Sequence, residues 1–222
     1  MASYSLRNLL VLALAAGPVA CHHGDHDETV YGAQALPGGG LVTPLRWAPT
    51  DNPEDQLRAG LAPLAGHRLA MTPFGDHRAI QDRIGTNTEE AMPRPVVTPD
   101  NVPAFVSEHI GRVLYEAHFP LVPANPTEVI HGDVIEFFVT EGNRYEGTVT
   151  LDVQLTDPQG RELWHGPATG HSRRFGHSLN AEMYMNALSD GILDAVKNLL
   201  ENPQFQLAMH AAPPPVVQVE TH

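Results

Sequence analysis

The chain has 222 residues, and its 20 prolines and 19 glycines are concentrated toward the two ends, which leaves a middle of roughly one small domain's length. It carries 26 Asp and Glu against 13 Lys and Arg, a formal net charge of −13. A surface this acidic repels phosphate backbones, so nucleic acid is excluded as an expected partner, and a single cysteine excludes a disulfide within the chain.

The first twenty residues have the three parts of a secretory signal peptide. Arg7 supplies a positive charge, residues 9–16 are apolar but too few to span a bilayer, and residues 17–20 are small residues that lead to Cys21. We therefore expect residues 1–20 to be removed and the mature chain to be exported.

Cys21, the first mature residue, resembles the lipobox cysteine of bacterial lipoproteins, which is acylated with fatty chains such as palmitate. Two or more acyl chains make a stable bilayer anchor at ~0.8 kcal/mol per buried methylene. The lipoprotein pattern has Leu, Val or Ile where this chain has Pro18, so ordinary cleavage after Ala20, which leaves a free thiol, is the alternative. In lipoprotein sorting an Asp after the cysteine commonly signals retention in the inner membrane, so by this resemblance His22 implies the outer membrane, facing the periplasm.

Two segments of the mature chain have the composition of flexible spacers. Residues 21–65 combine charge, Gly and Pro, including Leu-Pro-Gly-Gly-Gly at 36–40, and bury too little apolar surface to offset the entropy of ordering. We expect a lipidated tether there. Residues 203–222 contain Pro213-Pro214-Pro215 and are predicted to be a disordered tail.

The intervening residues 66–202 are predicted to form an α+β domain. A first strand lies near residues 67–74, and a polar loop follows the turn at Gly75-Asp76. Apolar residues at three-and-four spacing then predict a helix over residues 102–117, with Asp100 or Asn101 as its cap.

The next segments change to the period of β-strands. The apolar residues 129–139, the strict alternation over 145–156 and the segment 162–175 predict three antiparallel strands, and residues 179–200 form a last amphipathic helix. The expected order is β-α-β-β-β-α. It predicts an antiparallel sheet with two helices packed on one face.

Fragments of this domain resemble the YajG-like family of bacterial outer-membrane lipoproteins. They are Phe-Gly-Asp-His-Arg at 74–78, Ile84-Gly85, and residues 134–139, 145–157, 160–164 and Gly170. The resemblance spans about residues 67–200. It implies a small periplasmic α+β domain in envelope maintenance, and no catalytic mechanism.

The 13 histidines raise the question of metal binding. His22, His23, Asp25 and His26, followed by Asp27 and Glu28, place imidazoles and carboxylates suited to Zn²⁺ or Cu²⁺ in one flexible segment. The alternative is a solvated polar spacer that binds no cofactor. His109 lies on the apolar side of its helix and is interpreted as a core residue.

Arg173 and Arg174 form a basic pair in an acidic protein, suited to an anionic headgroup or an acidic partner, or to salt bridges with nearby carboxylates. His165, His171 and His177 share strand parity, but six residues span ~20 Å of strand, which argues against a single site.

Asp76-His77-Arg78 follows the first strand and invites a catalytic interpretation, since Asp can orient His as a base. Adjacent residues of an extended chain point to opposite sides, so we interpret the triplet as a turn, with Asp76 accepting backbone hydrogens and Arg78 pairing with an acid. The sequence contains no nucleophile elbow, phosphate loop or His-Glu-x-x-His motif, so no enzyme activity is expected.

Two functions are compatible with these observations. The favoured one is a non-enzymatic outer-membrane lipoprotein, held in the bilayer by acylated Cys21, whose domain binds another envelope protein. The alternative is a metal-binding lipoprotein that uses the tether. The sequence does not decide whether the domain also forms a homo-oligomer.

Overall fold

The computed structural model describes residues 32–119 and 121–211. Three long strands form the main part of its sheet, with the last of them at one edge: β7 (Glu128–Glu141), β8 (Arg144–Thr156) and β9 (Glu162–Phe175). They pair antiparallel in chain order, as the alternating pattern predicts. The β8–β9 turn closes with a hydrogen bond of 2.9 Å from the Gly160 amide to the Asp157 carbonyl, with Gly160 at φ +83°.

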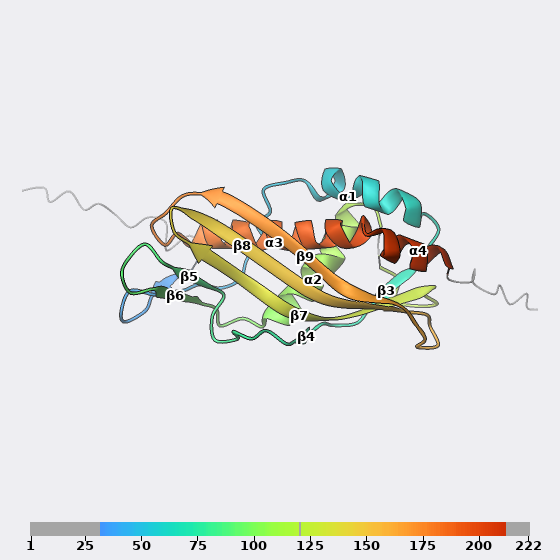
Figure 1. The fold of residues 1–222 in the computed structure, drawn as a ribbon, viewed down its shortest axis with the longest axis horizontal. Coiled ribbons are helices and arrows are strands. Elements are labelled where there is room, and N and C mark those ends of the chain that lie inside the picture. The colour runs from blue at the N-terminus through green and yellow to red at the C-terminus, as the bar shows by residue number, and fades with distance from the viewer. Residues whose placement is uncertain (1–31, 120, 212–222) are drawn as a thin grey trace, which may run out of the picture.

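Six short strands extend this meander to a nine-stranded mixed sheet (Figure 1). They are β1 (Gln34–Ala35), β2 (Leu41–Val42), β3 (Leu69–Met71), β4 (Gly75–Asp76), β5 (Gly85–Asn87) and β6 (Arg94–Val97). The strands β3, β4 and β5 all run parallel to β7. The prediction of an α+β fold is confirmed, but the sheet is mixed rather than antiparallel, because these three strands run parallel to β7 and β2 runs parallel to β6.

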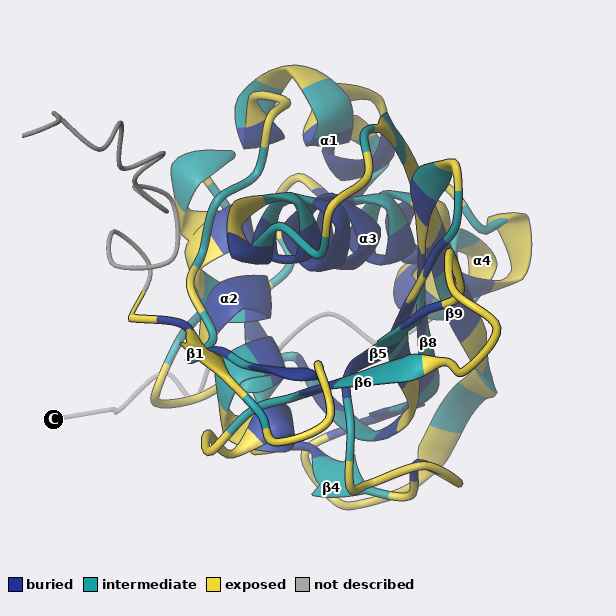
Figure 2. Ribbon diagram, turned by 90° about the vertical axis from the view of Figure 1, so that its left-hand side faces the viewer, coloured by how far each residue is buried: buried dark blue, intermediate teal, exposed yellow. Residues whose placement is uncertain are grey.

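Helices cover one face of the sheet (Figure 2). The two predicted helices are confirmed as α2 (Val102–Glu116) and α3 (Ala181–Leu200). Asn101, rather than Asp100, caps α2 by accepting from the Ala104 amide at 2.9 Å, and Asn180 caps α3 in the same way. Within the described ranges, no helix is both long and apolar enough to span a bilayer.

The structure differs from the expected tether from residue 32 onward. The helices α1 (Pro53–Leu61) and η1 (Ala62–Leu64) follow β1 and β2, and α1 contacts α3. Leu41, Leu57 and Leu64 are fully buried. These few apolar side chains find partners on α3 and the sheet, so ordering this Gly- and Pro-rich segment is favourable.

The C-terminal segment also differs from the expected disordered tail. Its first residues form α4 (Pro203–Ala211), which buries Phe205 and Met209. The ring of Phe205 meets Trp164 of β9 edge to face, with 5.3 Å between centroids. Residues 212–222, with the three consecutive prolines, lie outside the described residues.

The helix α3 lies directly on β8 and β9 because both the helix and the strands have glycines at the contact. A Cβ atom on Gly170 of β9 would collide with the Gly191 carbonyl oxygen and the Ala195 amide nitrogen of α3. Only glycine fits at this position.

Candidate functional site

The sheet has a gap along β7 between its parallel neighbours β4 and β5. Asp76 of β4 is opposite Val134 of β7, and Gly85 of β5 is opposite Val139. Asp76 and Gly85 are nine positions apart in the chain, whereas their β7 partners are only five positions apart, so the connecting loop must leave the plane of the sheet. Among the described strands, none pairs with residues 135–138 on this side.

A β-bulge in β7 coincides with the gap. Against β8, Val134 pairs with Leu151 and Glu136 pairs with Thr150, which leaves Ile135 as the extra residue. A bulge bends the strand and re-aims its side chains. Here Ile135 stays 38% exposed although β7 belongs to the middle of the sheet.

The gap contains a cavity of about 410 Å³, which we call the β7 cavity. Its lining is residues 78–80 of the loop after β4, residues 135–138 of β7 and Thr150 of β8. Two apolar side chains in this lining, Ile80 and Ile135, are partly exposed. The volume is within the range of pockets that bind small ligands or short peptide segments.

Arg78 is the one buried charged residue in this lining. Its Nε and Nη2 donate to the two carboxylate oxygens of Asp76, each at 2.8 Å, and its backbone amide donates to Asp76 at 3.3 Å. The contacts expected of Asp76 and Arg78 are therefore present, as an Asx-turn closed by the Asp76 side chain, but the turn predicted at Gly75-Asp76 is wrong because these two residues pair with β7 as strand β4. The remaining guanidinium nitrogen, Nη1, is buried and has no hydrogen-bond partner among the described residues.

His77 takes no part in this pair. Its Nδ1 lies 3.4 Å from Asp133, and its side chain is largely exposed. The hydrogen bond from Arg78 is the main cause that holds the pKa of Asp76 below its usual value, while burial opposes it. Asp76 is thus a charged partner of Arg78 and does not orient an imidazole.

Sequence reasoning found the turn but missed the cavity. The signal for the bulge is a change of parity along β7. The buried apolar residues Ile130 and Val134 have even numbers, and Phe137 and Val139 have odd numbers. A strand that switches parity contains an extra residue, which here is Ile135.

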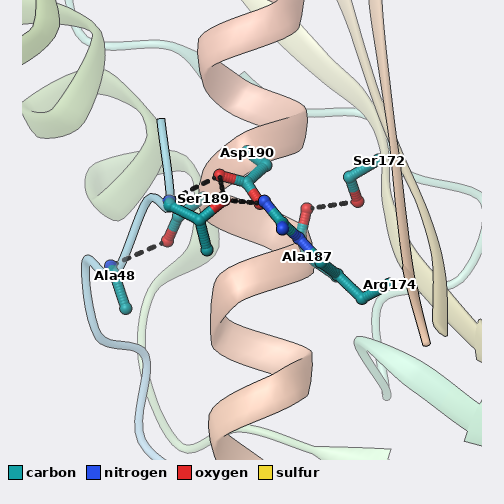
Figure 3. A network of polar contacts seen from close by, with 7 residues as sticks. Ala48, Ser172, Arg174, Ala187, Ser189 and Asp190 are labelled. Atoms are coloured by element: carbon teal, nitrogen blue, oxygen red, sulfur yellow. Dashed lines mark hydrogen bonds and ion pairs between the residues drawn. The ribbon is translucent and has the colours of Figure 1, made fainter. Parts of the chain in front are cut away.

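Arg173 and Arg174 point to opposite faces of β9, and each meets a carboxylate. Nη2 of Arg173 lies 3.4 Å from Glu146 on the face away from the helices. On the helix side, Nε of Arg174 donates to Asp190 of α3 at 3.0 Å (Figure 3). Binding of an anionic partner by this pair stays a prediction.

Asp190 also holds the segment before α1 against α3. Its Oδ1 accepts from the Thr50 amide at 2.8 Å, and the neighbouring Ser189 hydroxyl accepts from the Ala48 amide at 3.0 Å (Figure 3). Burial raises the pKa of Asp190 despite these donors. The Arg174–Asp190 pair therefore joins three parts of the chain, which is a structural role.

The strand histidines do not form one site. His165 lies 2.9 Å from Asp152, His171 lies 3.5 Å from the Thr148 hydroxyl, and His177 lies beyond the end of β9 beside Ser178. The hydrogen bond with Asp152 raises the pKa of His165. Their separation agrees with the expectation from strand spacing.

His109 is a core residue, as predicted. It is 6% exposed, its ring stacks on Trp47 with 4.7 Å between centroids, and its Nδ1 lies 2.7 Å from the Phe105 carbonyl oxygen. Burial lowers the pKa of this imidazole. The neutral form is thus favoured in the folded protein.

Cys21, the predicted lipidation site, lies outside the described residues, as do His22, His23, Asp25 and His26 of the predicted metal site. Within residues 32–119 and 121–211, His, Cys, Asp and Glu form no group of three or more arranged to hold a metal ion. Zn²⁺ or Cu²⁺ binding by the tether stays a prediction.

No family model matches the sequence. No curated protein matches it either. The resemblance to the YajG-like family therefore stays a prediction from the quoted fragments.

Several solved structures are distantly similar to the chain. A protein of family DUF330 from Xanthomonas campestris is 11% identical with a TM-score of 0.48, over 66% of this chain and 89% of that one. A candidate lipoprotein from Caulobacter crescentus is 15% identical with a TM-score of 0.36, over 57% and 89%. The PelC dodecamer from Paraburkholderia phytofirmans is 16% identical with a TM-score of 0.35, over 60% and 88%.

Proposed function

We propose that this chain is a non-enzymatic lipoprotein of the bacterial outer membrane. Its domain faces the periplasm and binds another envelope protein through the β7 cavity. The signal-peptide pattern before Cys21 supports export and acylation. Acylation confines the domain to the membrane surface, where a partner in the same envelope is met at high effective concentration.

The β7 cavity is the observation that carries the binding proposal. It lies where the connection from β4 to β5 leaves the sheet, and its Thr150 is on the face of β8 opposite to Val149, which contacts α3. Ile80 is 46% exposed and Ile135 is 38% exposed, and the charged residues Arg78 and Glu136 belong to the same lining. An exposed apolar recess with a polar rim is typical of a binding site.

The chemistry of the lining favours binding over catalysis. The hydroxyl group in the lining is that of Thr150. Its Oγ1 lies 3.2 Å from the Thr169 hydroxyl rather than beside a base that could activate it as a nucleophile. Asp76 and Arg78 neutralise each other, and a carboxylate held by a guanidinium is a poor general base. These groups are suited to position a partner.

Site-specific photo-crosslinking in living cells tests the proposal. We expect a photoreactive residue at Ile135 to capture a discrete envelope protein, and the capture to weaken when Arg78→Met is added. Tyr115, which is 70% exposed on α2, gives the matched control position and should not capture that protein. Equal capture from both positions, or none from Ile135, would contradict the proposal.

A further inference from the structure

Arg78, which lines the β7 cavity, has a guanidinium nitrogen whose N–H groups are not used by the described residues. A guanidinium has five N–H groups, and Asp76 accepts from Nε and Nη2 only. Nη1 has no acceptor among the described residues, although the whole residue is only 7% exposed. A buried donor without an acceptor costs free energy, so a ligand that supplies an acceptor is favoured.

The charges around the cavity decide which acceptor fits. Asp76 already balances Arg78, and Glu136 adds a carboxylate that forms no ion pair among the described residues. A second carboxylate from a ligand would be repelled there, whereas a neutral carbonyl oxygen would not. Glu136 and the net charge of −13 instead favour a Lys or Arg next to that carbonyl.

The gap in the sheet has the dimensions of an extended segment. Residues 135–138 of β7 have no strand partner on this side among the described residues, and four residues span about 13 Å of strand. A peptide that adds to a sheet in this way binds by its main chain, while its alternate side chains enter pockets. Ile80 and Ile135 offer the apolar contacts for such side chains.

We infer that the β7 cavity binds a short, extended, apolar segment of the partner that carries a basic residue. A backbone carbonyl of this segment accepts a hydrogen bond from Nη1 of Arg78, and the basic residue pairs with Glu136. The inference rests on the proposed function, because it names the class of segment that the binding site recognises.

A random heptapeptide library provides the test, selected on the full mature chain with Cys21→Ser. We expect the selected peptides to alternate apolar residues and to be richer in Lys and Arg than in Asp and Glu. Arg78→Met should weaken their binding at least about tenfold. Arg173→Met, which breaks an exposed ion pair of β9, should leave the affinity unchanged.

Glu136→Gln keeps the test decisive if Arg78→Met does not fold, because Glu136 is exposed. This variant should still select apolar peptides but lose the preference for Lys and Arg. Selection of acidic peptides, of none, or of peptides that bind Arg78→Met equally well would overturn the inference. If the peptide selection fails but crosslinking from Ile135 captures an envelope protein, the proposed function stands and only the inference about the bound segment is lost. If the peptides behave as expected but Ile135 captures nothing, the proposed function fails and the peptide preference of the cavity stands.

Discussion

The phenol hydroxyl of Tyr184 on α3 donates a hydrogen bond of 2.8 Å to the carboxylate of Glu141, the last residue of β7. Both residues are fully buried, and the second oxygen of Glu141 accepts from the Leu179 amide at 2.8 Å. Burial, reinforced by the nearby carboxylate, raises the pKa of Tyr184, so the phenol stays protonated and remains a donor. One buried carboxylate thus joins the end of the sheet to the start of α3.

Removing the hydroxyl should therefore destabilise the fold. Tyr184→Phe keeps the edge-to-face contact with Tyr145, at 5.2 Å between ring centroids, but leaves one oxygen of Glu141 without its donor. We expect the free energy of unfolding in urea to fall by about 1–3 kcal/mol. Tyr115→Phe, at an exposed position, should change it by less than about 0.5 kcal/mol. Equal values for the two variants would contradict this role of Glu141.

Two glycine substitutions should have opposite effects, because one glycine lies at the close contact of α3 with β9 and the other has room for a methyl group. Gly170→Ala places a methyl group against the α3 backbone, so we expect a loss of about 3 kcal/mol or more in the free energy of unfolding. Gly111→Ala adds a methyl group in α2 with only ordinary contact, 3.5 Å from Leu121, and should stabilise by about 0.5–1 kcal/mol. Thermal and urea unfolding of both variants measure the contrast, and a tolerated Gly170→Ala would show that the packing is looser.

The elements with strong local signals are those that the sequence predicts well. The alternation of β8 and the apolar stripe and Asn101 cap of α2 are readable without knowledge of the rest of the fold. The helix α1 was missed because its segment has the composition of a linker. Its ordering depends on burying Leu57. The helix that it contacts, α3, is more than a hundred residues further along the sequence.

The same distinction applies to the candidate site. The Asp76–Arg78 turn is local, and its residue types predict it. The β7 cavity depends on how far apart the partners of Asp76 and Gly85 lie on β7 and on a bulge at Ile135, which are properties of strand pairing. No local pattern in residues 75–87 reveals that pairing.

The buried His109 predicts a loss of stability in mild acid. Burial holds its pKa in the folded protein below the usual 6.5, so the unfolded chain binds the proton more readily. The contribution of the neutral imidazole to the free energy of unfolding is fully present above pH 6.5. It is lost as the pH falls through the pKa that His109 has in the folded protein. His109→Phe keeps a ring beside Trp47 and should have a flatter profile of unfolding free energy between pH 8 and 5.

His165 gives a control of opposite sign. Asp152 raises its pKa, so its contribution is present below pH 6.5 and is lost as the pH rises through the folded pKa. Because this imidazole is exposed, solvent screens the pair and the contribution is small. His165→Gln should therefore leave the acid side of the profile almost unchanged or slightly steeper. A profile for His109→Phe that matches the wild type would contradict the buried neutral histidine.

Zn²⁺ titration locates any tight metal site. The described residues hold no group of three or more metal-binding side chains, whereas residues 22–28 contain three imidazoles and three carboxylates. We expect the heat of Zn²⁺ binding to the mature chain to disappear when residues 22–28 are deleted, and to fall when His22, His23 and His26 are replaced by Asn. Binding that survives the deletion would place the site in the domain.

Acylation of Cys21 predicts the mass of the amino-terminal peptide and the phase into which the protein partitions. In the native host, the amino-terminal peptide of the mature chain should carry the mass of its fatty chains, and the protein should enter the detergent phase of a detergent–water split. Cys21→Ser should remove both properties. Pro18→Leu supplies the residue type that the lipobox pattern has at that position, so it should be processed at least as completely as the natural sequence. An unmodified Cys21 in a protein that stays in the aqueous phase would show cleavage after Ala20 by ordinary signal peptidase, and the lipid anchor would have to be abandoned.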